Sequence, residues 1–367
     1  MAIPLVRKAS DYATNYLIQH AFIQDPEIVP TAPPRINREY RQFTDDMVVA
    51  AKLAKERHEA TLEGETHTEP LSKFAQITSG NLSIPLDSTR PGIQKGGYNE
   101  ETTLSHNGLP INVNTAYMQG DRFSMEDEHI AKVFHIRQGH QTHTISLFGV
   151  FDGHSGPETS AFVKQNIVRT LQYYLAREPL SDTAIFNALK LTFVDLDQRF
   201  VGKSGTCASV AIILDGNLWV ANTGDSRVVL DNDGETAQLS RDAKPEKEPF
   251  LDRILKRMGD LWTASNKSKT LRVNGNLAVG GSIGDHTVRG SQGHGCVSPR
   301  PKITKTPLAD IRKNSRLIIG CDGLWDVATS KEVVEAKKGA GSIMKAAYRA
   351  GSQDNITVMT VDLSGIL

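Results

Sequence analysis

The chain has 367 residues, which is enough for one large domain or two modest ones. Lysine plus arginine and aspartate plus glutamate each number 42, so no overall charge would attract nucleic acid or an anionic membrane. The N-terminus lacks the apolar core of a signal peptide, and no apolar run reaches membrane-spanning length. The three cysteines, Cys207, Cys296 and Cys321, are odd in number and widely spaced. We therefore expect a cytoplasmic protein with free thiols and no membrane span, although an unfamiliar secretion signal would escape this reasoning.

Residues 1–110 differ from the rest and form a predicted N-terminal extension. Asp11–Phe22 and Thr44–Glu63 have the apolar spacing of helices, whereas Gly64–Pro110 is rich in Gly, Pro, Thr, Ser and Asn. So long a stretch without periodicity is unusual inside a compact domain. We predict that the extension carries no catalytic motif and either packs on the main domain, targets it, or is a partly disordered arm.

From residue 111 to residue 367 the apolar patterns become regular. The predicted strands are Val113–Asp121, Ala208–Leu214, Leu218–Asn222, Val228–Leu230, Thr236–Leu239, Leu317–Cys321 and Ile356–Leu363, with two more that end near Phe134 and Phe151. The predicted helices are Pro157–Arg177, Asp182–Val201, Pro249–Met258 and a short one near Ser342–Ala350. Strands outnumber helices, and Asp-Gly pairs at 215–216 and 233–234 are typical of hairpin turns. The order favours the α+β class with antiparallel sheets.

A third Asp-Gly pair, Asp152-Gly153, does not fit the hairpin pattern. It ends the apolar run Thr144–Phe151 and is followed at once by Pro157 and a helical pattern. Asp152 therefore lies where a buried strand ends and a helix begins, so its carboxylate is expected to be positioned by the fold.

Acidic residues recur at such places. Asp322-Gly323 repeats the pattern, and Glu126 and Asp354 each adjoin another strand. One acidic residue at a strand end is more often a cap or turn former than a ligand. Four such sites indicate carboxylates that converge, and converging carboxylates repel unless cations lie between them. Hard oxygen ligands favour magnesium or manganese, and the Cys and His spacings of a zinc site are absent.

Seven ordered motifs resemble those of the metal-dependent type 2C Ser/Thr protein phosphatases, the PPM family. They are Met118–Asp127, Phe151–Gly156, Ser204–Ala208, Asn222–Arg227, Leu277–Asp285, Cys321–Asp326 and Asp354-Asn355. Together they cover about residues 112–363 in family order. The resemblance implies a catalytic domain at 111–367, with a flap at about 242–301. It also implies a sandwich of two antiparallel β-sheets flanked by helices, with a dinuclear metal centre at one end.

The same resemblance implies a ligand set for two manganese or magnesium ions. Asp152 would bridge them, Asp322 and Asp354 would hold the first, and Glu126 with the Gly153 carbonyl would hold the second.

Three further residues receive catalytic roles from the resemblance. Asp127 matches a position that orients metal-bound water, and Arg122 matches the residue that binds the substrate phosphate. The alternative for Arg122 is an ion pair with Glu126. His154 matches the general acid, although it could also cap the helix that follows.

Asp225 and Asp326, with Asp322, match positions that bind a third, weaker cation in some relatives. The chain also departs from the family pattern. Cys207 stands where threonine is common, Ala243 replaces a frequent histidine, and Gly280-Gly281 replaces a Ser-Arg pair. These departures concern the third cation and substrate recognition.

The expected function is a protein serine/threonine phosphatase that hydrolyses phosphoserine and phosphothreonine by attack of a metal-bridging hydroxide, with a phosphoprotein as partner. Two alternatives stay open. The chain could act on a non-protein phosphoester, or it could be a partner-binding pseudophosphatase, against which the presence of Glu126, Asp152, Asp322 and Asp354 argues. The oligomeric state is not readable from the sequence.

Overall fold

The computed structural model of the chain describes residues 71–83, 97–247, 249–256, 261–263, 271–288 and 295–367. The helices predicted at Asp11–Phe22 and Thr44–Glu63 lie outside the described residues. Leu71–Leu367 forms one compact unit. Within the described residues, no helix combines the length and the hydrophobicity that crossing a membrane requires.

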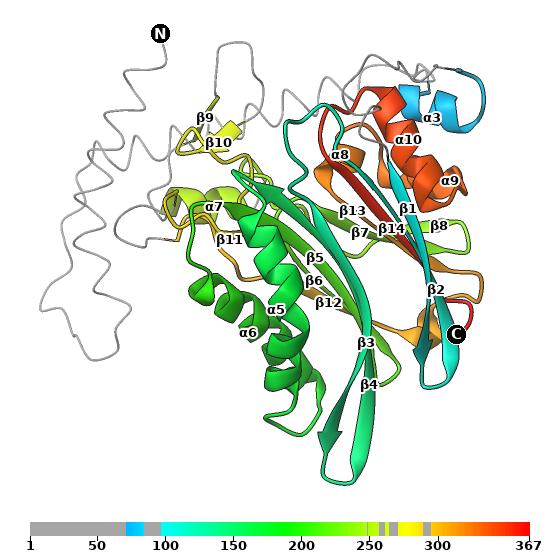
Figure 1. Ribbon diagram of the computed structural model, residues 1–367, viewed down its shortest axis with the longest axis vertical. Helices are drawn as coiled ribbons and strands as arrows, with labels where there is room; N and C mark the ends of the chain where they lie inside the picture. Colours follow the sequence, from blue (N-terminus) through cyan, green and yellow to red (C-terminus); the bar gives the residue numbers. More distant parts are fainter. Residues whose placement is uncertain (1–70, 84–96, 248, 257–260, 264–270, 289–294) are drawn as a thin grey trace, which may run out of the picture. The chain divides into compact units, whose positions relative to one another are not determined.

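Two antiparallel sheets of six strands each form the centre of the described unit (Figure 1). The first sheet runs in the order β1 (Tyr98–His106), β2 (Leu109–Met118), β14 (Ile356–Asp362), β13 (Arg316–Gly320), β7 (Arg227–Asn232) and β8 (Glu235–Gln238). The second runs in the order β12 (Lys302–Pro307), β6 (Asn217–Thr223), β5 (Gly205–Leu214), β4 (Gln141–His154) and β3 (Glu128–Gln138), with β11 (Ile283–Gly284) paired to β5.

Helices cover the outer face of each sheet. On the second sheet lie α5 (Glu158–Leu175) and α6 (Asp182–Arg199), and on the first lie α3 (Lys73–Thr78), α8 (Asp322–Trp325), α9 (Ser330–Glu335) and α10 (Ala340–Ala350). The other described elements are α7 (Phe250–Lys256), the pair β9 (Leu261–Thr263) and β10 (Leu271–Val273), and the 3-10 turn η2 (Leu308–Asp310). The α+β sandwich flanked by helices is confirmed.

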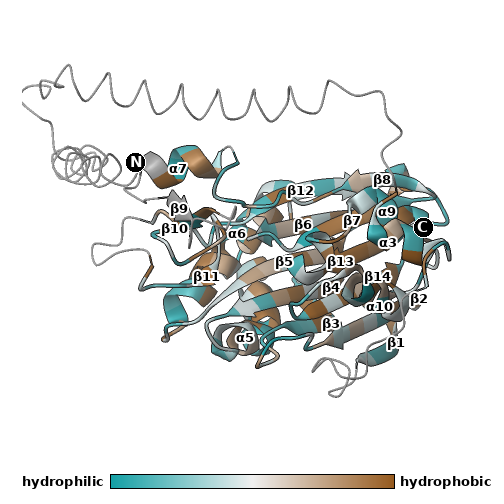
Figure 2. Cartoon of the chain, turned by 90° about the horizontal axis from the view of Figure 1, so that it is seen from above, coloured by the Kyte–Doolittle hydropathy of each residue, from teal (hydrophilic) through white to brown (hydrophobic). Residues whose placement is uncertain are grey.

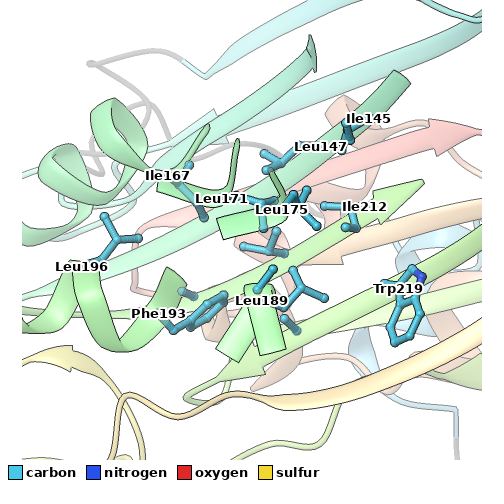
Figure 3. Packing of buried hydrophobic residues seen from close by; sticks show 14 of the residues in the cluster. Ile145, Leu147, Ile167, Leu171, Leu175, Leu189, Phe193, Leu196, Ile212 and Trp219 are labelled. Atoms are coloured by element: carbon cyan, nitrogen blue, oxygen red, sulfur yellow. The ribbon is translucent and has the colours of Figure 1, made fainter. Parts of the chain in front are cut away.

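The strand β4 shows how the sequence builds these layers. Its side chains alternate in direction, so Ile145, Leu147 and Phe151 face the helices, whereas Phe148 and Val150 face the first sheet. Figure 3 shows the helix side of this core, where Ile167 and Phe193 from α5 and α6 meet the strands. Figure 2 shows the apolar colour along the strands of both sheets. The core therefore has three layers, and residues at even numbers in β4 point between the sheets.

The boundary of the main domain lies earlier than the sequence predicted. A boundary at residue 110 divides the β1–β2 hairpin, which pairs from Tyr98–Tyr117 to His106–Leu109. The sequence pattern missed β1 because only His106 among its side chains is buried. Helix α3 also belongs to this unit, because Phe74 is fully buried against the helices on the first sheet.

The sequence also missed short elements on both sheets. Strand β12 lies at the edge of the second sheet, and its residues are exposed or half-buried, so no apolar alternation marks it. Helices α8 and α9 are a few residues long, which is shorter than the periodic patterns that reveal helices.

The described part of the flap, 242–301, has its own small apolar cluster. Ile254, Val273 and Val297 pack there together with Cys207 of β5. This packing connects the described flap residues to the second sheet close to the end of β4.

Phe74 allows a test of the revised boundary. Phe74→Ala should lower the free energy of unfolding by about 3–5 kcal/mol, because it leaves a cavity in a packed cluster. Urea denaturation of the full chain measures the change. Leu71→Ala is the matched control, since Leu71 is 56% exposed and its truncation should matter little. Equal, small effects of both substitutions would show that α3 is not part of the cooperative unit.

Candidate active site

Asp152 lies near the end of β4, on the side of the strand that faces the first sheet. Strand alternation places it on the same face as Phe148 and Val150. Its partner in the ladder is Cys207 of β5, which points to the same side. The ligand atoms of Asp152, Cys207 and Asp225 lie within 4.8 Å of one another. The ends of the strands therefore bring acidic groups together between the two sheets.

Asp322 and Asp354 come to this place from the first sheet. Strand β13 ends at Gly320, and Asp322 opens α8, with its N–H 3.4 Å from Oδ2 of Asp152. Asp354 directly precedes β14. Among the described residues, no three of Glu126, Asp152, Asp322 and Asp354 form a group as tight as the one around Cys207. The four predicted carboxylates thus share one region without their oxygens converging closely.

The electrostatics of this cluster oppose ionisation. Burial, followed by the charge of neighbouring carboxylates, raises the pKa of Asp152 and that of Asp322 well above the usual range. Burial also raises the pKa of Asp127 to about 7, although the hydroxyl of Thr357, 2.7 Å away, donates to its carboxylate and opposes the rise. A positive charge among these groups would restore their ionised forms.

Glu126 is held in a loop that touches the end of β4. Ser124 Oγ donates to Oε1 at 2.6 Å, and the N–H of Gly156 donates to Oε2 at 3.0 Å. Gly153 lies so close that a Cβ there would fall 2.2 Å from the Glu126 carbonyl oxygen. Only glycine allows this approach, and as a result the backbone of Gly153 lies directly against the backbone of Glu126.

Asn355 joins the segments that carry the acidic residues. Its Oδ1 accepts from the N–H of Glu126 at 2.8 Å, and its Nδ2 donates to the carbonyls of Gln119 at 2.7 Å and Ser124 at 2.9 Å. The side chain is 5% exposed. The sequence placed Asn355 in a motif beside Asp354 but assigned it no role.

Arg122 forms an ion pair with Asp354. The alternative partner expected from the sequence, Glu126, instead receives its hydrogen bonds from Ser124 and Gly156. The arginine side chain is 61% exposed, so its guanidinium lies at the open side of the cluster.

His154 ends β4 and pairs with a residue that the sequence left without a role, Asp285. The ring Nε2 lies 2.7 Å from Asp285 Oδ2, which also accepts from Ser282 Oγ at 2.5 Å. Gly205 makes the pair possible, because it pairs with both His154 and Gly284, and a Cβ there would fall 2.4 Å from Nε2. Burial lowers the pKa of His154, but the hydrogen bond and charge of Asp285 outweigh it and raise the pKa overall.

Asp225 and Asp326, the residues expected at a third cation, both contact Lys244. The Lys244 ammonium pairs with Oδ2 of Asp225 and lies 3.6 Å from Oδ1 of Asp326. The carboxylates raise the pKa of Lys244 although its burial lowers it. Sequence reasoning missed Lys244, whose only signal was its place next to Ala243, where the chain departs from the family pattern.

The site thus offers carboxylate and carbonyl oxygens from both sheets, with an arginine and a histidine beside them. Such oxygens suit hard divalent cations, and the arginine can bind an anion bidentately. The arrangement is chemically suited to hydrolysis of an anionic ester.

Residues 111–356 match the family model described as Protein phosphatase 2C. The protein "Probable protein phosphatase 2C 45" of Oryza sativa subsp. japonica is 34% identical over 77% of this chain and 95% of its own length. "Probable protein phosphatase 2C 27" of Arabidopsis thaliana is 33% identical over 67% of this chain and 67% of its own.

Solved structures resemble the fold. A serine-threonine phosphatase 2C from Toxoplasma gondii matches with a TM-score of 0.56 over 73% of this chain and 99% of that chain, at 19% identity. A sex determining protein of C. elegans matches with a TM-score of 0.57 over 69% of this chain and 65% of that chain, at 24% identity. At these identities the likeness concerns the sandwich architecture alone.

Asn355→Ala should loosen the Glu126 loop. The substitution leaves three backbone groups without their partner, so we expect the free energy of unfolding to fall by about 2–3 kcal/mol. Hydrogen exchange of the Glu126 amide should accelerate, because that N–H loses its acceptor. Asn314→Ala, which removes an exposed amide, is the control. Unchanged protection of the Glu126 amide would contradict the role given to Asn355.

Proposed function

The chain belongs to the protein phosphatase 2C family and is a metal-dependent serine/threonine protein phosphatase, and on this premise we propose which residues perform the reaction. The proposal is that two manganese or magnesium ions lie in the acidic cluster, where phosphoserine and phosphothreonine of proteins are hydrolysed. The observation that carries it is the close approach of the half-buried residues Asp152 and Asp322, whose anionic forms are disfavoured by burial and by the charge of neighbouring carboxylates.

The donor set fits such ions. Asp152 would contact both, Asp322 and Asp354 would hold one, and Glu126 with the Gly153 carbonyl would hold the other. The glycine at 153 supports this set, because a side chain there would collide with the Glu126 backbone. When bound, the two ions supply a water nucleophile at neutral pH and neutralise phosphoryl oxygens.

The residues of the chain provide the remaining steps. Asp127, held by the Thr357 hydroxyl, orients the attacking water through its second carboxylate oxygen. Arg122 is exposed and pairs with Asp354, and its guanidinium can bind two oxygens of the substrate phosphate. With a metal ion at Asp354, that carboxylate would no longer need the arginine as its partner, and Arg122 would be available to the phosphate. Arginine and aspartate thus bind and position the two reactants.

His154 donates the proton that the departing serine or threonine oxygen needs. Asp285 accepts from Nε2 and stabilises the charged ring, so Nδ1 is the nitrogen assigned to proton delivery. His154 as a mere helix cap receives no support, because Pro157 carries the N-cap position of α5.

The cellular setting is also a proposal. The three cysteines in the described residues are buried and free, which supports a reducing, cytoplasmic environment.

Two experiments test the proposed dinuclear metal centre: removal of the metal ions and the substitution Asp152→Asn. Activity on a phosphoserine peptide should vanish with a chelator and return with manganese. Asp152→Asn should lower kcat by about 10³-fold or more and weaken manganese binding in calorimetry, because the bridging charge is lost. Asp182→Asn is the control, since Asp182 is exposed and pairs with Lys305 far along the chain. Full activity of a metal-stripped sample would refute the centre.

The leaving-group dependence tests His154. His154→Ala should lower kcat on a phosphoserine peptide by about 10²–10⁴-fold, but should affect an aryl phosphate little, because a nitrophenolate leaves without a proton. Asp285→Asn should show the same pattern with smaller losses. His140→Ala, on an exposed turn, is the control. Equal losses on both substrates would reject the general-acid role.

A further inference from the structure

The carboxylate of Asp225 has both oxygens engaged by the chain. Oδ1 accepts from the thiol of Cys207 at 3.3 Å, and Oδ2 pairs with the Lys244 ammonium. Asp225 is 2% exposed, so its charge needs a partner inside the protein. Lys244 meets this need, and its Nζ also lies 3.6 Å from the more exposed carboxylate of Asp326.

The two residues that precede Lys244, Asp242 and Ala243, are held by several hydrogen bonds. Arg227 forms a fork to the carboxylate of Asp242, at 3.1 and 2.6 Å. The N–H of Ala243 donates to the carbonyl of Gly224 at 2.8 Å, and its carbonyl accepts from Gly280 at 2.5 Å. The hydrogen-bonded segment Asp242–Ala243 therefore positions Lys244 against Asp225, because Ala243 bonds to Gly224, the neighbour of Asp225.

We propose that the ammonium of Lys244 occupies the place of a third divalent cation, so that this chain binds two such ions and not three. The inference rests on the proposed dinuclear centre and concerns only the neighbouring acidic pair, Asp225 and Asp326.

A third ion does not fit beside Lys244. It would carry two positive charges to within a few ångströms of the ammonium, and like charges at such distances repel strongly when partly buried. Its ligands would also face that charge, because Oδ2 of Asp225 pairs with the Lys244 ammonium and Oδ1 of Asp326 lies 3.6 Å from it. Magnesium and manganese require several oxygen ligands, and at this position the ammonium already compensates the negative charge of the two carboxylates.

Counting bound manganese tests the inference. Calorimetric titration of the full chain, with the free manganese followed by electron paramagnetic resonance, should give two bound ions. Lys244→Met keeps the length of the side chain and removes its charge, and it should gain one further, weaker ion. Combining it with Asp326→Asn should abolish the gained ion, which would place that ion at the acidic pair. Lys305→Met is the control: it removes a lysine that pairs with Asp182, and it should keep two bound ions.

If Lys244→Met fails to fold, two other ion counts test the inference. The unmodified chain should bind two ions. Asp326→Asn alone should also bind two, and this substitution changes a side chain that is 63% exposed. Three ions in the unmodified chain, or a loss of one in Asp326→Asn, would overturn the assignment of Lys244. Two ions in a folded Lys244→Met chain would also overturn it. Fewer than two ions in the unmodified chain would refute the dinuclear centre itself, and this inference with it.

Discussion

The crowding of buried carboxylates at one end of the sandwich is the constraint on which the rest of the site depends. Burial and the charge of neighbouring carboxylates raise the pKa of Asp152 and of Asp322, so the folded chain without cations disfavours the ionised forms of these residues. Buried like charges reduce stability, and apolar residues would serve the fold better. The crowded carboxylates lower the stability of the fold, but they supply the oxygens that divalent cations can share as ligands.

The chain places three basic side chains around this cluster, each on a different carboxylate. Arg122 pairs with Asp354, Lys244 with Asp225, and His154 with Asp285. The three differ in accessibility: the arginine side chain is 61% exposed, whereas the lysine and the histidine are each 25% exposed. An exposed arginine can change partners when substrate arrives, whereas the enclosed lysine and histidine are better suited to permanent pairing.

Sheet register gives these pairs their geometry. The alternation along β4 directs Asp152 between the sheets, and the ladder to β5 sets Cys207 opposite it. Two glycines remove side chains where the segments meet, Gly153 against the Glu126 backbone and Gly205 beneath the His154–Asp285 pair. Small shifts of register would separate these groups, because a slip by one residue turns every side chain of a strand to the other face.

The sequence by itself determined the α+β class, the order of most elements and the identity of the acidic residues, because strand alternation, helical spacing and Asp-Gly strand ends are local signals. It could not reveal β1, whose side chains are mostly exposed. Only the tertiary structure decided that Arg122 pairs with Asp354, 232 positions away, and that Lys244 neutralises Asp225. Such partners depend on which strand ends the two sheets bring together, and no local pattern in the chain encodes that meeting.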